Sequence, residues 1–344
     1  MKVTSASVDF PAALAQAQAG QPLSAADTKR LFDAIFTGRL SEDEIIAYLA
    51  TTADRKPMVD ELVGAVISMR QHMRSLTAPA NALDLCGTGG DGLGTLNIST
   101  AVSFVVAACG VPVAKHGNRS ASSRSGAADV LEALGVNINL DPQAAASVLA
   151  ETGLVFLFAQ TYHPAMKHVG HARKQIGRRT IFNLLGPLAN PARVTHQLVG
   201  VFSSDWLVPY AEALKALGSR RAWIVHGKDG LDEISISGPT QIAVLDNGTV
   251  TTGELTPEDA GLGRSPLAEI TGGNAAHNAR ALRHLLEAGT PGAYRDIVLL
   301  NAGAALMVAG VAKDVKDGVA KAAQALDSGA ARAKLEALIA ASNK

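Results

Sequence analysis

The spacing of apolar residues changes once along the chain, near residue 80. Between residues 11 and 76, apolar positions such as Leu31, Ile35 and Phe36 recur every three or four residues, and no strand-like alternation interrupts them. Serines stand ahead of two of these stretches, where the N-terminus of a helix favours them. The pattern predicts an all-helical N-terminal segment that ends at a linker over residues 77–82.

From residue 83 onward, short apolar runs alternate with helical stretches, which is typical of right-handed crossovers and a largely parallel sheet. An Asp-Asn-Gly turn inside 240–255 predicts a hairpin, and roughly the last sixty residues are helical in pattern. We therefore expect an α/β protein with a small helical N-terminal domain and a larger α/β domain. The strands are expected over 83–86, 111–116, 154–159, 196–202 and 221–227.

Composition narrows the class of protein. The 344 residues are 47% hydrophobic and 18% charged, so a large core is possible. Lys plus Arg and Asp plus Glu are both 31, which gives no case for nucleic acid as a partner. Cys86 and Cys109 lie in apolar runs and are expected to be reduced thiols. With no signal-like N-terminus and no unbroken apolar span, we expect a soluble cytoplasmic protein without membrane contact.

A glycine-rich stretch, LDLCGTGGDGLGTLNIS over 83–99, carries a match to G-x-G-x-x-G at Gly87, Gly89 and Gly92. A dinucleotide site also needs an acidic residue about 20 positions later, at the end of the second strand. That strand instead ends in Lys115 and His116, and no Gly-Lys-Ser/Thr closes a Walker loop. The sequence therefore argues against an NAD enzyme and favours another phosphate held by loop amides and a helix N-terminus.

Two further polar clusters follow strand ends. Residues 115–126 hold three cations and four serines, and Asp232 with Glu233 follows the strand at 221–227. Asp91 would repel a bare phosphate, whereas a sugar phosphate carrying Mg²⁺ removes the conflict, and paired carboxylates suit Mg²⁺. Each cluster alone also fits helix capping, a solvated turn or surface charge. Loops at adjacent strand ends nevertheless converge on one crevice in an α/β sheet.

Five segments occur along the chain in this order: GTGGDGLGTLNIST, KHGNR, HPAMKHVGHAR, TIFNLLGPLANP and DEIS. They occur in the same order in the anthranilate phosphoribosyltransferase family, which the chain resembles along nearly its whole length. KHGNR is less specific, since pyrimidine nucleoside phosphorylases resemble it there. The resemblance implies a nucleoside phosphorylase class II fold, with residues 1–78 and a returning 175–195 forming the helical domain. Residues 79–174 and 196–344 would form the α/β domain, joined by a hinge.

The resemblance also implies transfer of the phosphoribosyl group of 5-phosphoribosyl 1-pyrophosphate to anthranilate in tryptophan biosynthesis, with release of pyrophosphate. It implies Mg²⁺ as cofactor and a homodimer formed through the helical domain. Anthranilate contacts would be Gly87, Asn118 and Arg173, and metal contacts Ser99, Asp232 and Glu233. Contacts to phosphoribosyl pyrophosphate would be Gly87, Gly90, Asp91, Thr95, Asn97, Ile98, Ser99, Thr100, Lys115, His116, Gly117, Asn118, Arg119, Ser120, Ala121, Ser122, Ser123 and Ala127.

Two departures from the family pattern stand out. Ala127 replaces a serine that relatives often have, so one hydroxyl contact is absent, and residues 50–61 are less apolar and less Gly-rich than usual. No catalytic base is assigned, because an aromatic amine is already neutral at pH 7; His116 is a candidate for positioning. Arg173 is expected on one helix running from residue 164 to 177.

Three alternatives remain: a nucleoside phosphorylase, a nucleic-acid-binding relative without activity, and an NAD dehydrogenase. The first usually lacks DGLGTLN, the second should be strongly basic, and the third fails at Lys115.

Overall fold

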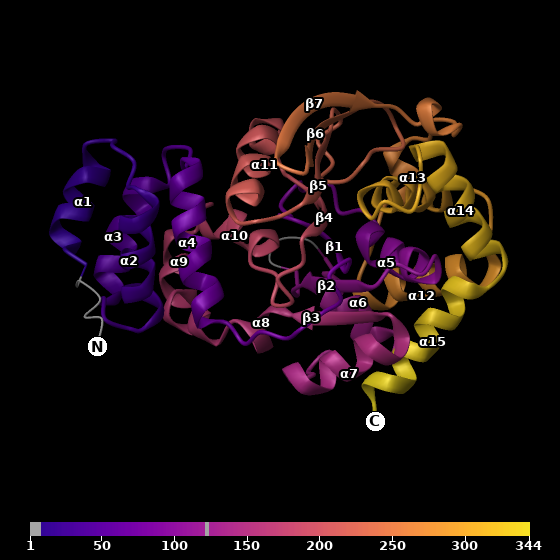
Figure 1. The fold of residues 1–344 in the computed structure, drawn as a ribbon, viewed down its shortest axis with the longest axis horizontal. Helices are drawn as coiled ribbons and strands as arrows, with labels where there is room; N and C mark the ends of the chain where they lie inside the picture. Colours follow the sequence, from indigo (N-terminus) through magenta and orange to yellow (C-terminus); the bar gives the residue numbers. More distant parts are fainter. Residues whose placement is uncertain (1–7, 121–123) are drawn as a thin grey trace.

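The computed structural model describes residues 8–120 and 124–344. A bundle of four helices comes first and lies at one end of the molecule (Figure 1). The side chain of Ser24 caps the second helix by accepting from the Asp27 N–H at 3.1 Å, and Ser41 forms a capping box with Glu44. The prediction of an all-helical start is confirmed, with helices α1 (Phe10–Gln18), α2 (Ala25–Phe36), α3 (Glu42–Thr52) and α4 (Val59–His72).

A seven-stranded sheet forms the centre of the rest of the chain, in the order β3-β2-β1-β4-β5-β6-β7. The first five strands in this order are parallel, and β6 and β7 form an antiparallel hairpin that turns at Asn247 and Gly248 (φ +46° and +90°). The mostly parallel sheet and the hairpin are both confirmed. The strands are β1 (Leu83–Gly87), β2 (Val113–Gly117), β3 (Leu154–Phe158), β4 (His196–Gly200), β5 (Arg221–Gly227), β6 (Thr240–Asp246) and β7 (Thr249–Leu255).

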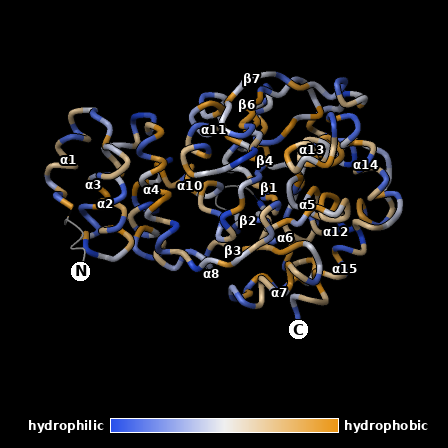
Figure 2. The backbone as a smooth tube through the Cα atoms, in the orientation of Figure 1, coloured by the Kyte–Doolittle hydropathy of each residue, from blue (hydrophilic) through white to orange (hydrophobic). Residues whose placement is uncertain are grey.

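Each face of the sheet is covered by its own set of helices, because side chains alternate along the strands. In β4, Leu198 points to one core and Val199 to the other. In Figure 2, orange marks the apolar residues of the central strands and the inner helices. One core includes α5 (Ile98–Ala108), α6 (Ala127–Ala133), α7 (Pro142–Thr152), α12 (Ala275–Ala288), α13 (Ala293–Val308), α14 (Val315–Asp327) and α15 (Ala330–Ser342). Across residues 8–120 and 124–344, no helix combines the length and apolar character needed to span a bilayer.

The other core joins the bundle to α11 (Leu207–Ala216) and to a segment from the middle of the chain. That segment contains the 3₁₀ turn η1 (Pro164–His168), α9 (Gly170–Ile176) and α10 (Phe182–Leu188), whereas α8 (Ala159–Tyr162), just before it, places Tyr162 in the first core. The expectation of one helix from 164 to 177 is therefore wrong. Val169 leaves helical geometry (φ −117°) to bury its side chain in the bundle core, and Gly177 ends α9 in the left-handed region (φ +65°).

The carboxyl ends of β1 and β4 lie side by side, with Gly87 paired to Gly200. The chain that follows β5 crosses this edge so closely that a Cβ built on Gly200 would lie 1.5 Å from the Asp232 carbonyl oxygen. A Cβ on Gly87 would lie 2.7 Å from Asp232 Oδ2. Both strands must therefore end in glycine for Asp232 to reach the edge of the sheet.

Replacing Gly200 by alanine should destabilise the protein by about 3 kcal/mol, because the Asp232 backbone has no room to yield. Urea unfolding measures the loss. Gly238→Ala is the matched control, since no atom lies within 4 Å of its added Cβ. Equal stability of the two variants would contradict the close approach.

Candidate active site

A cavity of about 1090 Å³ opens at the carboxyl ends of the central strands, between the sheet edge and the α9–α10 segment. It lies where the strand order reverses around β1, the usual place for a ligand in an open α/β sheet. Ala121, Ser122 and Ser123 fall outside the described residues. The other residues expected at the site all line this cavity: Gly87, Gly90, Asp91, Thr95, Asn97, Ile98, Ser99, Thr100, Lys115, His116, Gly117, Asn118, Arg119, Ser120, Ala127, Arg173, Asp232 and Glu233.

The first wall is the glycine loop between β1 and α5. Gly89 and Gly90 both have positive φ (+67° and +87°), a conformation that glycine adopts without strain. Asn97 occupies the N-cap position of α5, but its side chain makes no capping bond. Its amide instead donates to the Ser125 carbonyl at 3.4 Å, and its oxygen accepts from Asn278 at 2.8 Å. The loop is thus joined to two other segments of the chain.

A carboxylate from a distant segment takes the capping position at α5. Glu233 Oε1 accepts from the backbone N–H of Ser99 at 3.2 Å. A negative charge at the N-terminus of a helix is stabilised by the exposed N–H groups and the helix dipole. The segment that carries Asp232 and Glu233 is thereby attached to the start of α5, next to the glycine loop.

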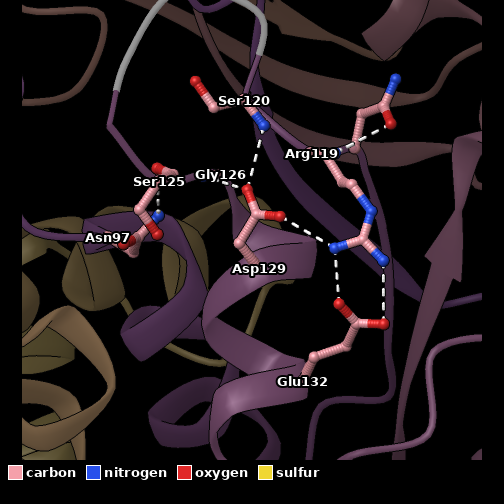
Figure 3. Close-up of polar contacts among 8 residues, drawn as sticks. Asn97, Arg119, Ser120, Ser125, Gly126, Asp129 and Glu132 are labelled. Atoms are coloured by element: carbon pink, nitrogen blue, oxygen red, sulfur yellow. Dashed lines mark hydrogen bonds and ion pairs between the residues drawn. The ribbon is translucent and has the colours of Figure 1, made fainter. Parts of the chain in front are cut away.

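The second wall is the stretch after β2, and Figure 3 shows how its two ends are held together. Asp129 accepts from the backbone N–H of Ser120 at 3.2 Å and of Gly126 at 2.9 Å. The Arg119 guanidinium donates to Asp129 at 2.9 Å and to Glu132 at 2.8 Å. In this arrangement Arg119 braces the loop against α6, so its role in binding phosphate stays a prediction.

Lys115 extends from β2 beneath both walls and is buried. Its Nζ donates to Ser99 Oγ at 3.0 Å and to the Leu85 carbonyl. Burial lowers the pKa of Lys115, while the charges of Asp84, Cys86 and Glu233 act in the opposite direction. The ammonium group therefore lies next to the acidic cluster and to the start of α5.

Asp232 and Glu233 form that acidic cluster together with Asp91. Burial, followed by the charges of Asp91 and Glu233, raises the pKa of Asp232 well above its usual value. Burial raises the pKa of Glu233 to about 7, although Lys115 favours its charged form. Asp232 Oδ2 accepts from the Gly89 N–H at 2.9 Å. Carboxylates this close favour a cation between them.

These residues fit Mg²⁺. Oxygen ligands from carboxylates suit this ion, which keeps several waters and shares the phosphates of a substrate instead of filling a closed protein cage. The described part of the chain holds no group of three or more His, Cys, Asp and Glu side chains arranged for a metal. The half-buried carboxylates of Asp232 and Glu233, beside the glycine loop, are two oxygen ligands of the required kind.

Two histidines form the inner end of the cavity, with ring centroids 5.1 Å apart. His116 Nδ1 donates to the Gly186 carbonyl at 3.0 Å, so Nε2 carries the lone pair. Burial, and then repulsion from His163, lowers the pKa of His116 to about 3, and burial lowers that of His163 to about 4. Such a weak base is poorly suited to take a proton near pH 7, which agrees with positioning.

Arg173 lines the cavity from α9, on the side that packs against the bundle. Its guanidinium lies 5.5 Å from the ring centroid of Phe182, and burial lowers its pKa. An arginine stays charged under such a shift, and this one can pair with a carboxylate that enters from solvent.

Sequence reasoning missed several residues that line the site or support it, and three of them illustrate why. Asp84 lies fully buried inside β1 and accepts from the His116 N–H at 2.9 Å; a charge within an apolar strand was the available signal. Asp129 stands third in a helix and reads as an ordinary capping residue. Arg179 donates to the Gly90 carbonyl at 2.5 Å, a contact across 89 positions that no local pattern reveals.

The fold and the site define a class of protein. Residues 79–332 match the α/β domain of a glycosyl transferase family, and residues 11–73 match the helical bundle domain of the same family. The glycine loop, the basic stretch and the acidic pair all lie within the α/β match.

Relatives identify the member of that class. An anthranilate phosphoribosyltransferase of Rhodopseudomonas palustris is 54% identical over 97% of this chain and 99% of its own length. One of Xanthobacter autotrophicus is 54% identical, over 98% and 97%. The chain belongs to the anthranilate phosphoribosyltransferase family.

Solved structures agree with this assignment. The anthranilate phosphoribosyltransferase of Thermus thermophilus superposes with a TM-score of 0.91 at 41% identity, covering 96% of this chain and 99% of the other. That of Saccharomyces cerevisiae, in complex with PRPP and Mg, gives a TM-score of 0.87 at 26% identity, covering 97% and 98%.

His116→Gln should reduce the acid sensitivity of folding. The native pKa of His116 is about 3, below the ordinary value near 6.5, so the unfolded chain takes up a proton first as pH falls from 6.5 towards 3. Wild-type protein loses stability in that window, and the variant should lose about 3 kcal/mol less between pH 7 and pH 4. Urea unfolding at both pH values measures this. His284→Gln, at an exposed position, is the control, and equal losses in all three proteins would contradict the burial of neutral His116.

Proposed function

We propose that Asp232, Glu233 and Ser99 hold Mg²⁺ while the glycine loop and Lys115 bind the pyrophosphate of 5-phosphoribosyl 1-pyrophosphate. The enzyme transfers the phosphoribosyl group to the amine of anthranilate, giving N-(5-phosphoribosyl)anthranilate and pyrophosphate, in tryptophan biosynthesis. The observation that carries the site assignment is the convergence of three strand-end segments on one cavity, with the half-buried acidic pair lining it.

The reaction breaks the bond between ribose C1 and a pyrophosphate oxygen and forms one between C1 and the anthranilate nitrogen. Negative charge gathers on the departing pyrophosphate, so donors fixed in advance lower the barrier. Mg²⁺ at this site would supply positive charge to the diphosphate oxygens. Lys115 adds a fixed positive charge, and the amides of the glycine loop add donors that need no rearrangement.

Anthranilate is held on the other side of the cavity in this proposal. Arg173 pairs with its carboxylate, and Asn118 and Gly87 border the amine. Nε2 of His116 carries a buried lone pair and accepts from an amine N–H, which orients the nitrogen lone pair towards C1. After the new bond forms the nitrogen becomes acidic, and its proton passes to an oxygen of the departing pyrophosphate, so no strong base from the protein is required.

The remaining roles rest on the family resemblance. We propose that the remaining residues of the phosphate stretches, 95–100 and 116–123 with Ala127, border the phosphoribosyl group. We also propose a cytoplasmic homodimer formed through a helical domain of residues 1–78 and 175–195, with 79–174 and 196–344 as the α/β domain. Packing of α10 in the bundle core supports the return of 175–195, and burial of Val169 and Ala172 in the same core extends the contact beyond the proposed boundary at 175.

The double variant Asp232→Asn with Glu233→Gln should lower Mg²⁺-dependent turnover by about a hundredfold or more, because the charge that draws the metal is gone. Loss of anthranilate fluorescence with excess phosphoribosyl pyrophosphate follows the reaction. Asp246→Asn with Glu254→Gln removes two exposed acids on the β6–β7 hairpin and serves as the control. Full activity in the first variant would refute the metal assignment.

Arg173→Gln should raise KM for anthranilate about tenfold to a hundredfold and leave KM for phosphoribosyl pyrophosphate close to wild type, because one charge-assisted pair is lost. Steady-state kinetics in each substrate separate the two. The control is Arg178→Gln. Arg178 lies on the same segment as Arg173, and the substitution breaks its exposed ion pair with Asp54. An equal rise in both KM values for Arg173→Gln would argue against carboxylate binding.

A further inference from the structure

Asn301 lies in the middle of α13 with no exposed surface, and its side-chain amide is fully hydrogen-bonded. Oδ1 accepts from the backbone N–H of Ile234 at 3.0 Å. Nδ2 donates to the Ile234 carbonyl at 2.8 Å and to the Ile297 carbonyl at 2.9 Å. The asparagine thus binds both backbone groups of one residue that is 67 positions away.

Ile234 belongs to a segment that makes no helix or strand hydrogen bonds. Residues 228–239, between β5 and β6, form neither helix nor strand, yet Ile234 itself is fully buried. Buried peptide groups need partners, and a lost partner costs about 1 to 3 kcal/mol. An asparagine amide has the same donor and acceptor geometry as a peptide group, so Asn301 acts here as a neighbouring strand would.

The helix that carries Asn301 is itself held firmly. Two residues further on, a Cβ at Gly303 would lie 2.9 Å from the Val315 carbonyl and from atoms of Val319. α13 and α14 therefore cross in direct backbone contact, and α13 also packs on α5, β4 and β5. An amide fixed on such a helix holds Ile234 at one place relative to the sheet.

Ile234 directly follows the two acidic residues of the site. On the cavity side they are held by amides of the substrate loops, at Gly89 and Ser99. On the core side the nearest restraint along the chain is the bond pair to Asn301.

We infer that Asn301 is a positioning residue for the reaction: its amide fixes Ile234 and thereby sets where the carboxylates of Asp232 and Glu233 stand against the glycine loop. The inference rests on the proposed role of these carboxylates in binding Mg²⁺ with phosphoribosyl pyrophosphate. A purely structural asparagine would affect stability alone. A positioning asparagine affects the metal and diphosphate side of the site and spares the anthranilate side.

The test uses Asn301→Leu, which keeps the side-chain volume and removes all three hydrogen bonds. Asn301→Ser and Asn301→Gln are measured in parallel, so that the result does not depend on one variant folding. Isothermal titration with Mg²⁺ and phosphoribosyl pyrophosphate gives binding without turnover. The expected result is at least about tenfold weaker binding and a similar rise in the Mg²⁺ concentration for half-maximal rate. KM for anthranilate should stay within about twofold of wild type.

Thr152→Val is the control, because Thr152 is a buried side chain at the opposite end of the strands. Its hydroxyl donates to the Val148 carbonyl at 2.9 Å and accepts from the Leu154 N–H at 3.1 Å. It should lower stability and leave Mg²⁺ dependence unchanged. Wild-type Mg²⁺ dependence in any folded Asn301 variant that lacks the bonds to Ile234, or an equal rise in both KM values, would overturn the inference. A failure of the proposed metal-binding role would show separately, as wild-type Mg²⁺ dependence in the double variant Asp232→Asn with Glu233→Gln.

Discussion

The close approach of Asp232 to the ends of β1 and β4 is the constraint on which the rest of the site depends. Two neighbouring parallel strands end in Gly87 and Gly200, and the space left by their missing Cβ atoms is filled by the backbone and carboxylate of Asp232. A loop that starts at β5 can therefore lie on the edge of β1. Without this crossing, Asp232 and Glu233 would lie beyond the end of β5, with β4 between them and the glycine loop.

Bringing carboxylates into this edge has an electrostatic cost, which the surroundings offset in part. Glu233 accepts from an amide at the start of α5, Asp232 accepts from the glycine loop, and Lys115 lies below both. The raised pKa values of the two acids indicate that the compensation is incomplete. A site of this kind gains most from a cation that arrives with the substrate, which links binding of the metal to binding of the diphosphate.

The sequence was informative wherever the signal was local. The 3.6-residue period located the bundle, short apolar runs located the strands, and Asp-Asn-Gly located the hairpin turn. It was not informative about contacts made across the fold. The bond from Asn278 to Asn97, the ion pairs of Arg119 with Asp129 and Glu132, and the role of Asn301 had no local motif. In these cases a polar side chain had several possible partners, and tertiary packing selected one.

Arg179 connects the two halves of the molecule at the cavity. It comes from the segment that packs with the bundle, its guanidinium lies 4.1 Å from the ring centroid of Phe202, and it donates to the carbonyl of Gly90. The conformation of the glycine loop and the position of the bundle are thus joined by a single charge-assisted bond. Because coupling between two sites is reciprocal, a ligand that broke this bond would affect the segment of Arg179 by the same free energy as a shift of that segment would affect binding of the ligand.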